Sequence, residues 1–466
     1  MSNEQEWREA GIESVFSGVT VDPRKMKRQE RFRHTMAAWL AAGLLVTAAH
    51  AGAQVSLPTV VDLAERNSAQ VRVAVAEVQR ATAGLQEAKD VYLPTFTLGS
   101  SAGYTYGFPV GQPTIYNFTS HSMFYSFSQP YYIRAARAAL NAAQLGLKDN
   151  EEQVALEAAL AYIQLDSDIR QLAALEEEKG YAERLATIER ERLLAGVDSR
   201  MEVTRAELTS AQVDLRRLQL EDDASQQRQK LAHLTGLPES GFVTDSKSIP
   251  AAPNFSSEVA LDDKATPGTA GIQAAYANAK SKQLTSSGDE KQNHRPTFAF
   301  GAEYNRFSKI NNYQEYYLRF QHNNFDIGVQ ITFPIFDANV RAKARESAAE
   351  ASRAIAEADQ TKFQSSEQLY LLRRSLRELA AQRRIAQLRS ELAREQVEVI
   401  QAQMQNGSGS PNLPPVTPKD EQQARIQERE RYVDALDATF QMFKAELTLA
   451  RSLGSLEDWI HSSGRP

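Results

Sequence analysis

Hydrophobic and polar residues along this chain follow two different periods, and the period changes at defined places. Between residues 57 and 91 apolar side chains recur about every 3.6 residues, which predicts one amphipathic helix. From Thr95 to Tyr106 apolar or aromatic residues take alternate positions, which predicts a half-buried strand. A loop rich in Gly, Pro and Asn then leads to a second aromatic strand, so we expect a β-hairpin over about 95–128.

The same order of patterns occurs a second time. Leu-Pro-Thr-Phe at 93–96 recurs as Arg-Pro-Thr-Phe at 295–298, and Pro130 recurs as Pro334. The second hairpin, expected over about 296–333, alternates apolar and polar residues more regularly than the first. A duplicated unit of this kind predicts two quasi-equivalent halves.

Each hairpin leads into a long helical hairpin, expected over about 131–235 and about 335–454. Residues 131–194 contain no Pro, so a continuous helix there would approach ~95 Å at ~1.5 Å per residue. Apolar residues at seven-residue spacing along these segments indicate coiled-coil packing. They include Ile133, Leu140, Leu147, Val154 and Ala161, then Met201, Leu208 and Leu215, and finally Ile426, Val433, Phe440 and Leu447.

The turns that join the long helices differ between the two copies. The first is short, with Gly196 suited to a left-handed helix stop and Asp198 or Ser199 available to cap the next helix. The second is a Gly, Ser and Pro stretch over 406–418 that cannot be helical. We therefore expect a compact tip in the first copy and an expanded tip in the second.

These patterns predict a division of the chain into five parts. They are an N-terminal extension with a signal peptide (1–53), a first structural repeat (54–237), a connector packed beside the helices (238–268), a second repeat (269–456) and a C-terminal tail (457–466).

The N-terminal segment has the features of a secretory signal. Basic residues precede an apolar run over 36–49, which ends in small residues at 49–53. The run is shorter than the ~20 residues of a spanning helix, which favours cleavage over anchoring, with Gly52 or Gln54 as the mature start. Because signal peptides begin close to their basic region, we expect Met26 to be the true start. No Cys follows the cleavage site, so no lipoprotein-type lipid anchor is expected.

Composition excludes several classes of function. Zero Cys removes disulfides and thiolate chemistry, and a net charge of −6 without a basic arm argues against a nucleic-acid partner. The seven His are scattered without metal-ligand spacing, and no phosphate loop or nucleophile elbow is present. Acidic groups at 176–178 and 222–223 are expected to be solvated helix surface. We therefore expect no enzyme, no metal and no cofactor.

Strands with one apolar and one polar face are what a closed membrane barrel requires, because lipid lies outside and water inside. A soluble sandwich would also bury one face, but four strands are too few to form one. One chain also has too few strands to close a barrel, so several copies are needed. The candidates for lipid-facing side chains are Phe96, Leu98, Tyr104, Phe298, Phe300, Ile327, Val329 and Ile331.

This order of segments, together with a Gly-x-x-Ser phrase that begins at Gly196 and a Leu-Thr-Gly at 234–236, resembles the TolC-type outer membrane efflux protein family. The resemblance covers almost all of the expected mature chain. It implies a mixed α and β fold, mostly long α-helices, in a homotrimer. Its twelve-stranded β-barrel would lie in the outer membrane of a Gram-negative type cell and continue as a coiled-coil α-barrel in the periplasm.

The resemblance also implies a function and partners. The trimer would be the exit duct of a tripartite efflux pump or a type I secretion system. It would conduct passively what an inner-membrane transporter delivers through a periplasmic adaptor protein. Adaptor contact falls on the two tips, at Gly196, Val197, Asp198, Ser199, Gly407 and Thr417.

Two acidic residues are candidates for the constriction of the closed aperture. Asp198 lies in the first tip, and Asp420 opens the helix after the second, where an Asp is also a common capping residue. The Gly and Pro insertion of the second tip departs from the family pattern, and Asn67-Ser68 stands where the family has Asn-Pro.

Two readings without a membrane barrel remain. A soluble periplasmic coiled-coil scaffold explains the heptads but neither the signal peptide nor the strands. An adaptor-like protein would need more strands than four.

Overall fold

The computed structural model describes residues 54–101, 114–239, 242–253, 269–307, 321–406 and 416–462. Residues from Gln54 onward form one unit. The predicted extension and signal peptide at 1–53 lie outside the described residues, as do Tyr104 and Gly407.

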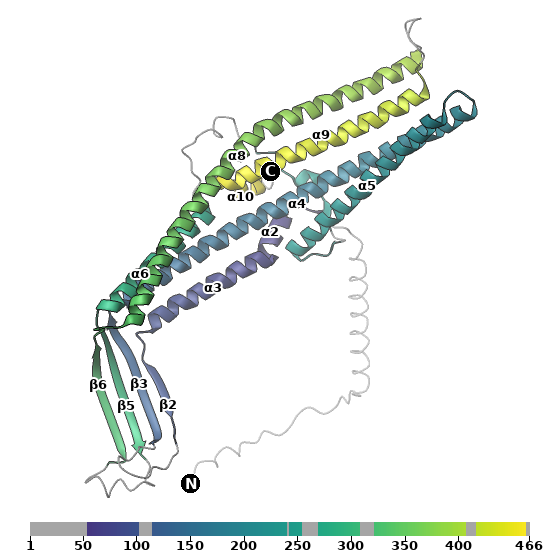
Figure 1. Cartoon of the computed structure of the whole chain (residues 1–466). Coiled ribbons are helices and arrows are strands. Elements are labelled where there is room, and N and C mark those ends of the chain that lie inside the picture. The colour runs from purple at the N-terminus through teal and green to yellow at the C-terminus, as the bar shows by residue number, and fades with distance from the viewer. Residues whose placement is uncertain are drawn as a thin grey trace, which may run out of the picture. The chain divides into compact units, whose positions relative to one another are not determined.

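The described part of the chain is mostly helical, with one antiparallel sheet (Figure 1). Its helices are α2 (Leu57–Asn67), α3 (Ala69–Asp90), α4 (Gln129–Leu194), α5 (Arg200–Thr235), α6 (Ala270–His294), α8 (Ala338–Asn406), α9 (Pro418–Leu453) and α10 (Leu456–Ser462). Its strands are β1 (Gln54–Val55), β2 (Thr95–Gly99), β3 (Thr114–Ser126), β4 (Val243–Thr244), β5 (Thr297–Phe307) and β6 (Asn323–Thr332), with a 3-10 helix η2 (Ser246–Ser248).

The order of these elements follows the duplicated pattern of the sequence. The first set is α3, β2, β3, α4 and α5, and the second is α6, β5, β6, α8 and α9. The four longer strands form one sheet in the order β2-β3-β5-β6, so the central β3–β5 pair joins the two sets. Each set therefore supplies half of the sheet and one pair of long helices (Figure 1).

Helix α4 is the central element of the unit. It packs against α3 and α6 toward the sheet and against α5 and α9 toward the tip, whereas α8 packs against α6 and α9. Consequently α5 lies at one edge of the tip half and α8 at the other (Figure 1).

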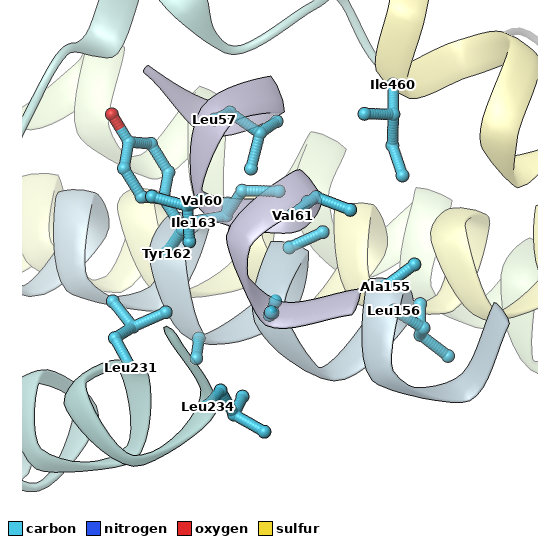
Figure 2. Packing of buried hydrophobic residues seen from close by; sticks show 14 of the residues in the cluster. Leu57, Val60, Val61, Ala155, Leu156, Tyr162, Ile163, Leu231, Leu234 and Ile460 are labelled. Atoms are coloured by element: carbon cyan, nitrogen blue, oxygen red, sulfur yellow. The ribbon is translucent and has the colours of Figure 1, made fainter. Parts of the chain in front are cut away.

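The main hydrophobic core surrounds the middle of α4, and we call it the waist core. Figure 2 shows labelled side chains of α2, α4, α5 and α10 gathered in this core. Its fully buried large residues include Leu57, Val60, Tyr162, Leu165, Leu231, Leu447 and Ile460, each no more than 1% exposed. At about 1.5–3 kcal/mol for each large apolar side chain, this burial makes the waist core a major source of stability.

The connector contributes to the waist core in the part that the structure describes. Strand β4 pairs in parallel with β1, next to the middle of α4. The hydroxyl of Tyr162 donates to the carbonyl of Val55 at 2.7 Å and accepts from the backbone N–H of Asp245 at 2.6 Å. The described residues of this segment are thus packed beside the helices.

The prediction of one helix over 57–91 was wrong. The helix breaks at Ser68, which ends α2 and whose hydroxyl accepts a hydrogen bond from the backbone N–H of Gln70 in α3. This break leaves Asn67 free to donate from its side-chain amide to the carbonyl of Thr235, at 2.7 Å. A Ser that bonds to the nearby backbone competes with helix continuation, which accounts for the break.

The segment at 457–466 was expected to be a tail, but residues up to Ser462 belong to α10. Leu456, Trp459 and Ile460 of this helix are buried in the waist core, and the Trp459 ring packs on Phe443 at 5.7 Å. The sequence did not predict this helix because its three buried apolar residues are too few to show a clear helical period.

Candidate functional site: a two-faced sheet and a helical tip

The four-stranded sheet has one apolar face. The register places Ala302 opposite Ile327 and Phe300 opposite Val329, so the apolar side chains of neighbouring strands share a face. Exposed on this face are Phe96 (63%), Leu98 (75%), Ile327 (64%), Val329 (62%) and Ile331 (51%). Phe298 and Phe300 lie on it too and are half-buried, with Phe298 packed on Phe124 at 6.0 Å. None of the described helices has the length and apolar character needed to cross a membrane.

The opposite face of the sheet is polar. Asn117 donates from its side-chain amide to Glu303 at 2.8 Å, and Asn305 donates to the same carboxylate oxygen at 2.8 Å. Thr97 and Thr119 share a hydrogen bond of 2.6 Å across β2 and β3. Water is the natural environment for this face, since its amides and carboxylates keep unused hydrogen-bonding capacity.

Both outer strands of the described sheet have an open edge. Strand β2 pairs only with β3, and β6 pairs only with β5. An open edge with an exposed apolar face cannot be tolerated in hydrocarbon, because unpaired backbone groups there cost several kcal/mol each. In hydrocarbon this sheet would need further strands along both edges.

The first tip closes with a compact turn. Gly196 has a φ of 72°, in the left-handed region that favours Gly. The N–H of Val197 donates to the carbonyl of Arg192 at 2.9 Å, and the N–H of Gly196 donates to that of Leu193 at 3.0 Å. These are the paired bonds of a Schellman helix end. Val197 is 62% exposed and Leu194 is 89% exposed, so the tip presents apolar side chains to solvent.

Asp198 is held by two cations rather than by a helix terminus. Arg192 donates from Nε to Oδ2 of Asp198 at 2.5 Å, and this bond lowers the pKa of the Asp198 carboxyl below its ordinary value. Lys419 Nζ of α9 lies 4.0 Å from the same oxygen. Asp198 was expected to be able to cap α5, but Ser199 is the capping residue and makes no side-chain hydrogen bond.

Lys419 joins the start of α9 to the first helical hairpin. Its Nζ lies 2.7 Å from Glu189 of α4 and 3.5 Å from Glu202 of α5. The hydrogen bond with Glu189, which is only 2% exposed, is the main reason that the pKa of Lys419 is raised. We call Glu189, Arg192, Asp198, Glu202 and Lys419 the tip cluster.

The described part of the second tip is a capped helix start. The backbone N–H of Thr417 donates to Oδ2 of Asp420 at 2.8 Å, and the Thr417 hydroxyl donates to the same oxygen at 2.7 Å. Pro418 takes the first helical position. The carboxylate of Asp420 is thus engaged as a cap, the alternative that its position in the sequence left open.

Sequence reasoning missed most of the tip cluster. Only Asp198 was a candidate, because the other four residues show no local pattern. It also placed the acidic group at 176–178 on a solvated surface, whereas Glu178 is fully buried. A heptad count could have found this one, since Glu178 follows Leu175 by three residues and precedes Ala182 by four on the same helix face.

The described residues hold no group of His, Cys, Asp or Glu side chains with the spacing to bind a metal ion. In the tip cluster Arg192 pairs with Asp198 and Lys419 pairs with Glu189, while Oε2 of Glu189 is buried without a hydrogen-bond partner. The arrangement is thus suited to holding helices together and to binding a protein surface.

Comparison with known proteins finds a family match for part of the chain. The family model described as outer membrane efflux protein matches residues 60–237. No curated protein sequence is significantly similar to the chain.

Solved structures share the fold over most of the chain. The outer membrane protein VceC of Vibrio cholerae has a TM-score of 0.68 at 16% identity. The match covers 85% of this chain and 96% of the VceC chain. The outer-membrane channel OprN has a TM-score of 0.67 at 17% identity, with 86% and 90% covered. The CmeC outer membrane channel of Campylobacter jejuni has a TM-score of 0.67 at 14% identity, with 86% of each chain covered. Residues 60–237 therefore carry an outer membrane efflux protein domain, in a chain that shares the fold of these outer membrane channels.

Proposed function

We propose that three copies of this chain form the exit duct of a tripartite efflux pump or a type I secretion system. The observation that carries the proposal is the sheet, which has one apolar face, one polar face and two open edges at the end of a long helical layer. Solutes would be delivered by an inner-membrane transporter through a periplasmic adaptor protein.

Barrel closure would satisfy both open edges of the sheet. Strand β6 of one copy would pair with β2 of the next, so four strands from each of three copies would close a twelve-stranded barrel. Its apolar face would contact the lipid of the outer membrane, and the face that carries Asn117 and Glu303 would line the water-filled interior.

The two edges of the helical layer support the same assembly. On α5, Met201, Leu208 and Leu215 keep a heptad spacing and are more than half exposed. On α8, the exposed residues Leu371, Ile385, Leu392 and Val399 also fall at multiples of seven. We infer that α5 of one copy packs against α8 of the next, which continues the ring of helices below the barrel.

The division into repeats follows from the same elements. We infer that residues 54–237 and 269–456 are the two structural repeats, with 238–268 as the connector between them. In a trimer the two repeats would alternate around the axis, so six quasi-equivalent tips would surround the aperture.

The first tip is the part of the chain best suited to adaptor contact. Gly196, Val197, Asp198 and Ser199 form a rigid turn that projects an exposed Val. Gly407 and Thr417 stay predictions for the second tip, where Thr417 is partly occupied by its bonds to Asp420.

The tip cluster is the candidate closure of the aperture. Lys419 ties α9 to both helices of the first hairpin, so separating the hairpins requires breaking its bonds to Glu189 and Glu202. An adaptor that binds the separated arrangement more tightly would shift the population toward the open duct. Asp198 has a role in this closure through Lys419, whereas Asp420 acts through the capping of α9.

Electron microscopy of the protein extracted from outer membranes with detergent, with its mass measured in parallel, tests the assembly. We expect a three-fold tube longer than ~100 Å, given helices of this length. The same preparation should conduct ions across a planar lipid bilayer. A water-soluble monomer that does not associate with membranes would contradict the proposal and favour a coiled-coil scaffold.

A further inference from the structure

Two carboxylates lie buried on the face of α4 that packs against α5 and α9. Neither Asp168 nor Glu178 has any exposed surface. Buried residues between them, Gln171 and Leu175, continue the alternating spacing of three and four residues, which places both carboxylates on one stripe of the helix. We call the contact of α4 with α5 and α9 over this length the three-helix seam.

Glu178 sits inside an apolar cluster. Leu175 and Ala182 lie one turn before and after it on α4, and both belong to a buried apolar cluster that also contains Val213 of α5. Neither of its carboxylate oxygens has a hydrogen-bond partner. An ionised carboxylate in such surroundings loses its hydration without replacement, which is costly.

The charged residues that face Glu178 do not compensate for this loss. From α5, Arg216 approaches only to 3.9 Å, and its other nitrogen lies 3.7 Å from Glu430 of α9. From α9, Glu430 and Asp434 both add negative charge near Glu178.

The remaining charges of this layer pair with one another. Lys179 lies 3.0 Å from Asp214, and Arg429 lies 3.0 Å from Glu177. The one cation that faces Glu178 is therefore shared, and the anions from α9 outnumber it.

Asp168 repeats the situation nearer the waist core. One of its oxygens accepts from the amide of Gln164 at 2.6 Å, and the other has no partner. Asp223 and Arg228 of α5 and Asp437 of α9 are the charged residues that face it. Here too the acidic neighbours outnumber the single cation.

Burial favours the protonated form of both groups. It is the main reason that the pKa of Glu178 is raised to about 7, with Glu430 and Asp434 adding to the effect and Arg216 opposing it. Burial also raises the pKa of Asp168 to about 6. Because the packed seam binds these protons more tightly than solvated carboxyls do, it is most stable at low pH. That stability falls as the pH rises toward about 7.

We propose that Asp168 and Glu178 make the three-helix seam a proton-sensitive element: proton binding tightens the packing of α4 against α5 and α9, and proton release loosens it. The seam ends at the tip cluster, where Glu189 of α4 binds Lys419. Under the proposed function, on which this step rests, a loosened seam makes the aperture easier to open.

Hydrogen exchange of the detergent-solubilised full-length protein tests the proposal without any need for conductance. Amides of α4 between residues 165 and 185 are followed between about pH 5.5 and about pH 8, corrected for the intrinsic pH dependence of exchange. If seam opening exposes Glu178 to water, its equilibrium constant should rise on the order of tenfold or more over this range. Asp168 adds a smaller rise at the acidic end.

Matched variants assign the effect to the buried groups. We expect Asp168→Asn with Glu178→Gln to abolish the pH-dependent opening. The control Glu176→Gln with Asp222→Asn removes the same charge from exposed positions on α4 and α5. This control should keep the pH-dependent opening. Glu178→Gln alone should remove the larger part, and serves if the double variant does not fold.

Two results would overturn the proposal. One is a wild-type protein whose corrected exchange in the seam does not change with pH. The other is a folded double variant that keeps the full pH dependence. A protein that never conducts ions would instead contradict the proposed function and leave this test unaffected.

Discussion

The long helices α4 and α8 occupy equivalent places in the two sets of elements but have different surroundings. Helix α4 buries large side chains such as Tyr162, Leu165 and Leu175, because other helices pack on several of its sides. Helix α8 buries mostly Ala, while Phe363 (68%) and Leu392 (65%) stay exposed. The same heptad pattern thus serves a core inside one copy in α4 and, as we propose, a contact between copies in α8.

The largest expected effect is a difference in folding stability between a substitution in α4 and one in α8. Leu165→Ala should lower the free energy of unfolding by about 2–5 kcal/mol, because it opens a cavity in the waist core. Leu392→Ala on α8 should change the stability of the separated monomer by less than about 0.5 kcal/mol, as exposed positions do. Denaturant unfolding in detergent measures the free energy of unfolding of both variants. Equal decreases would show that α4 and α8 do not differ in the way described.

The exposed face of α8 should matter for assembly instead. Leu392→Lys places a charge in the proposed contact between α8 and α5, so we expect the trimer to dissociate while each copy stays folded. Native mass and circular dichroism report the two properties. The control is Glu391→Lys, one position along on the exposed surface, which should leave the trimer intact. A trimeric Leu392→Lys protein would place the contact elsewhere.

Lys419 joins the two hairpins, so its removal should loosen the first from the second. We expect Lys419→Met to raise single-channel conductance or antibiotic leakage, since Glu189 then loses the cation that holds α9 against α4. Lys444→Met removes an exposed Lys from the same helix and should leave conductance as it was. If the two variants conduct alike, the tip cluster does not close the aperture.

The smallest effect distinguishes the acidic residues of the two tips. Asp198→Ala should raise conductance, because Asp198 partners Arg192 and Lys419. Asp420→Ala should instead destabilise the first turn of α9 by about 1 kcal/mol through loss of the cap. Hydrogen exchange at that turn measures this loss. A higher conductance for Asp420→Ala than for Asp198→Ala would reverse these roles.

Local periodicity explains how much of the fold was predictable. The alternation around Phe298 and Ile327 and the heptads through Phe440 and Leu447 depend on near neighbours in the chain, and the corresponding strands and helices are confirmed. The match of residues 60–237 to the outer membrane efflux protein model and the shared fold support an outer membrane channel rather than an enzyme or a soluble scaffold.

The missed features depend on residues far apart in the sequence. Lys419 contacts Glu189 only because α9 packs beside α4, and no sequence pattern near either residue predicts that contact. The break at Ser68 was missed because one hydroxyl bond to Gln70 overrides a helical period that continues through it. Glu178 was wrongly predicted to be exposed, because it directly follows two acidic residues that are exposed.

The position of α10 has a consequence for the order in which the protein folds. Trp459 donates from its indole N–H to the carbonyl of Ala251 at 2.9 Å, and Ile460 packs in the same core as Leu57. The first and last helices of the described chain therefore meet at one place. Because that contact spans nearly the whole polypeptide, the waist core cannot be completed until the last residues have been delivered. Folding should accordingly be slow, because the core has to wait for α10.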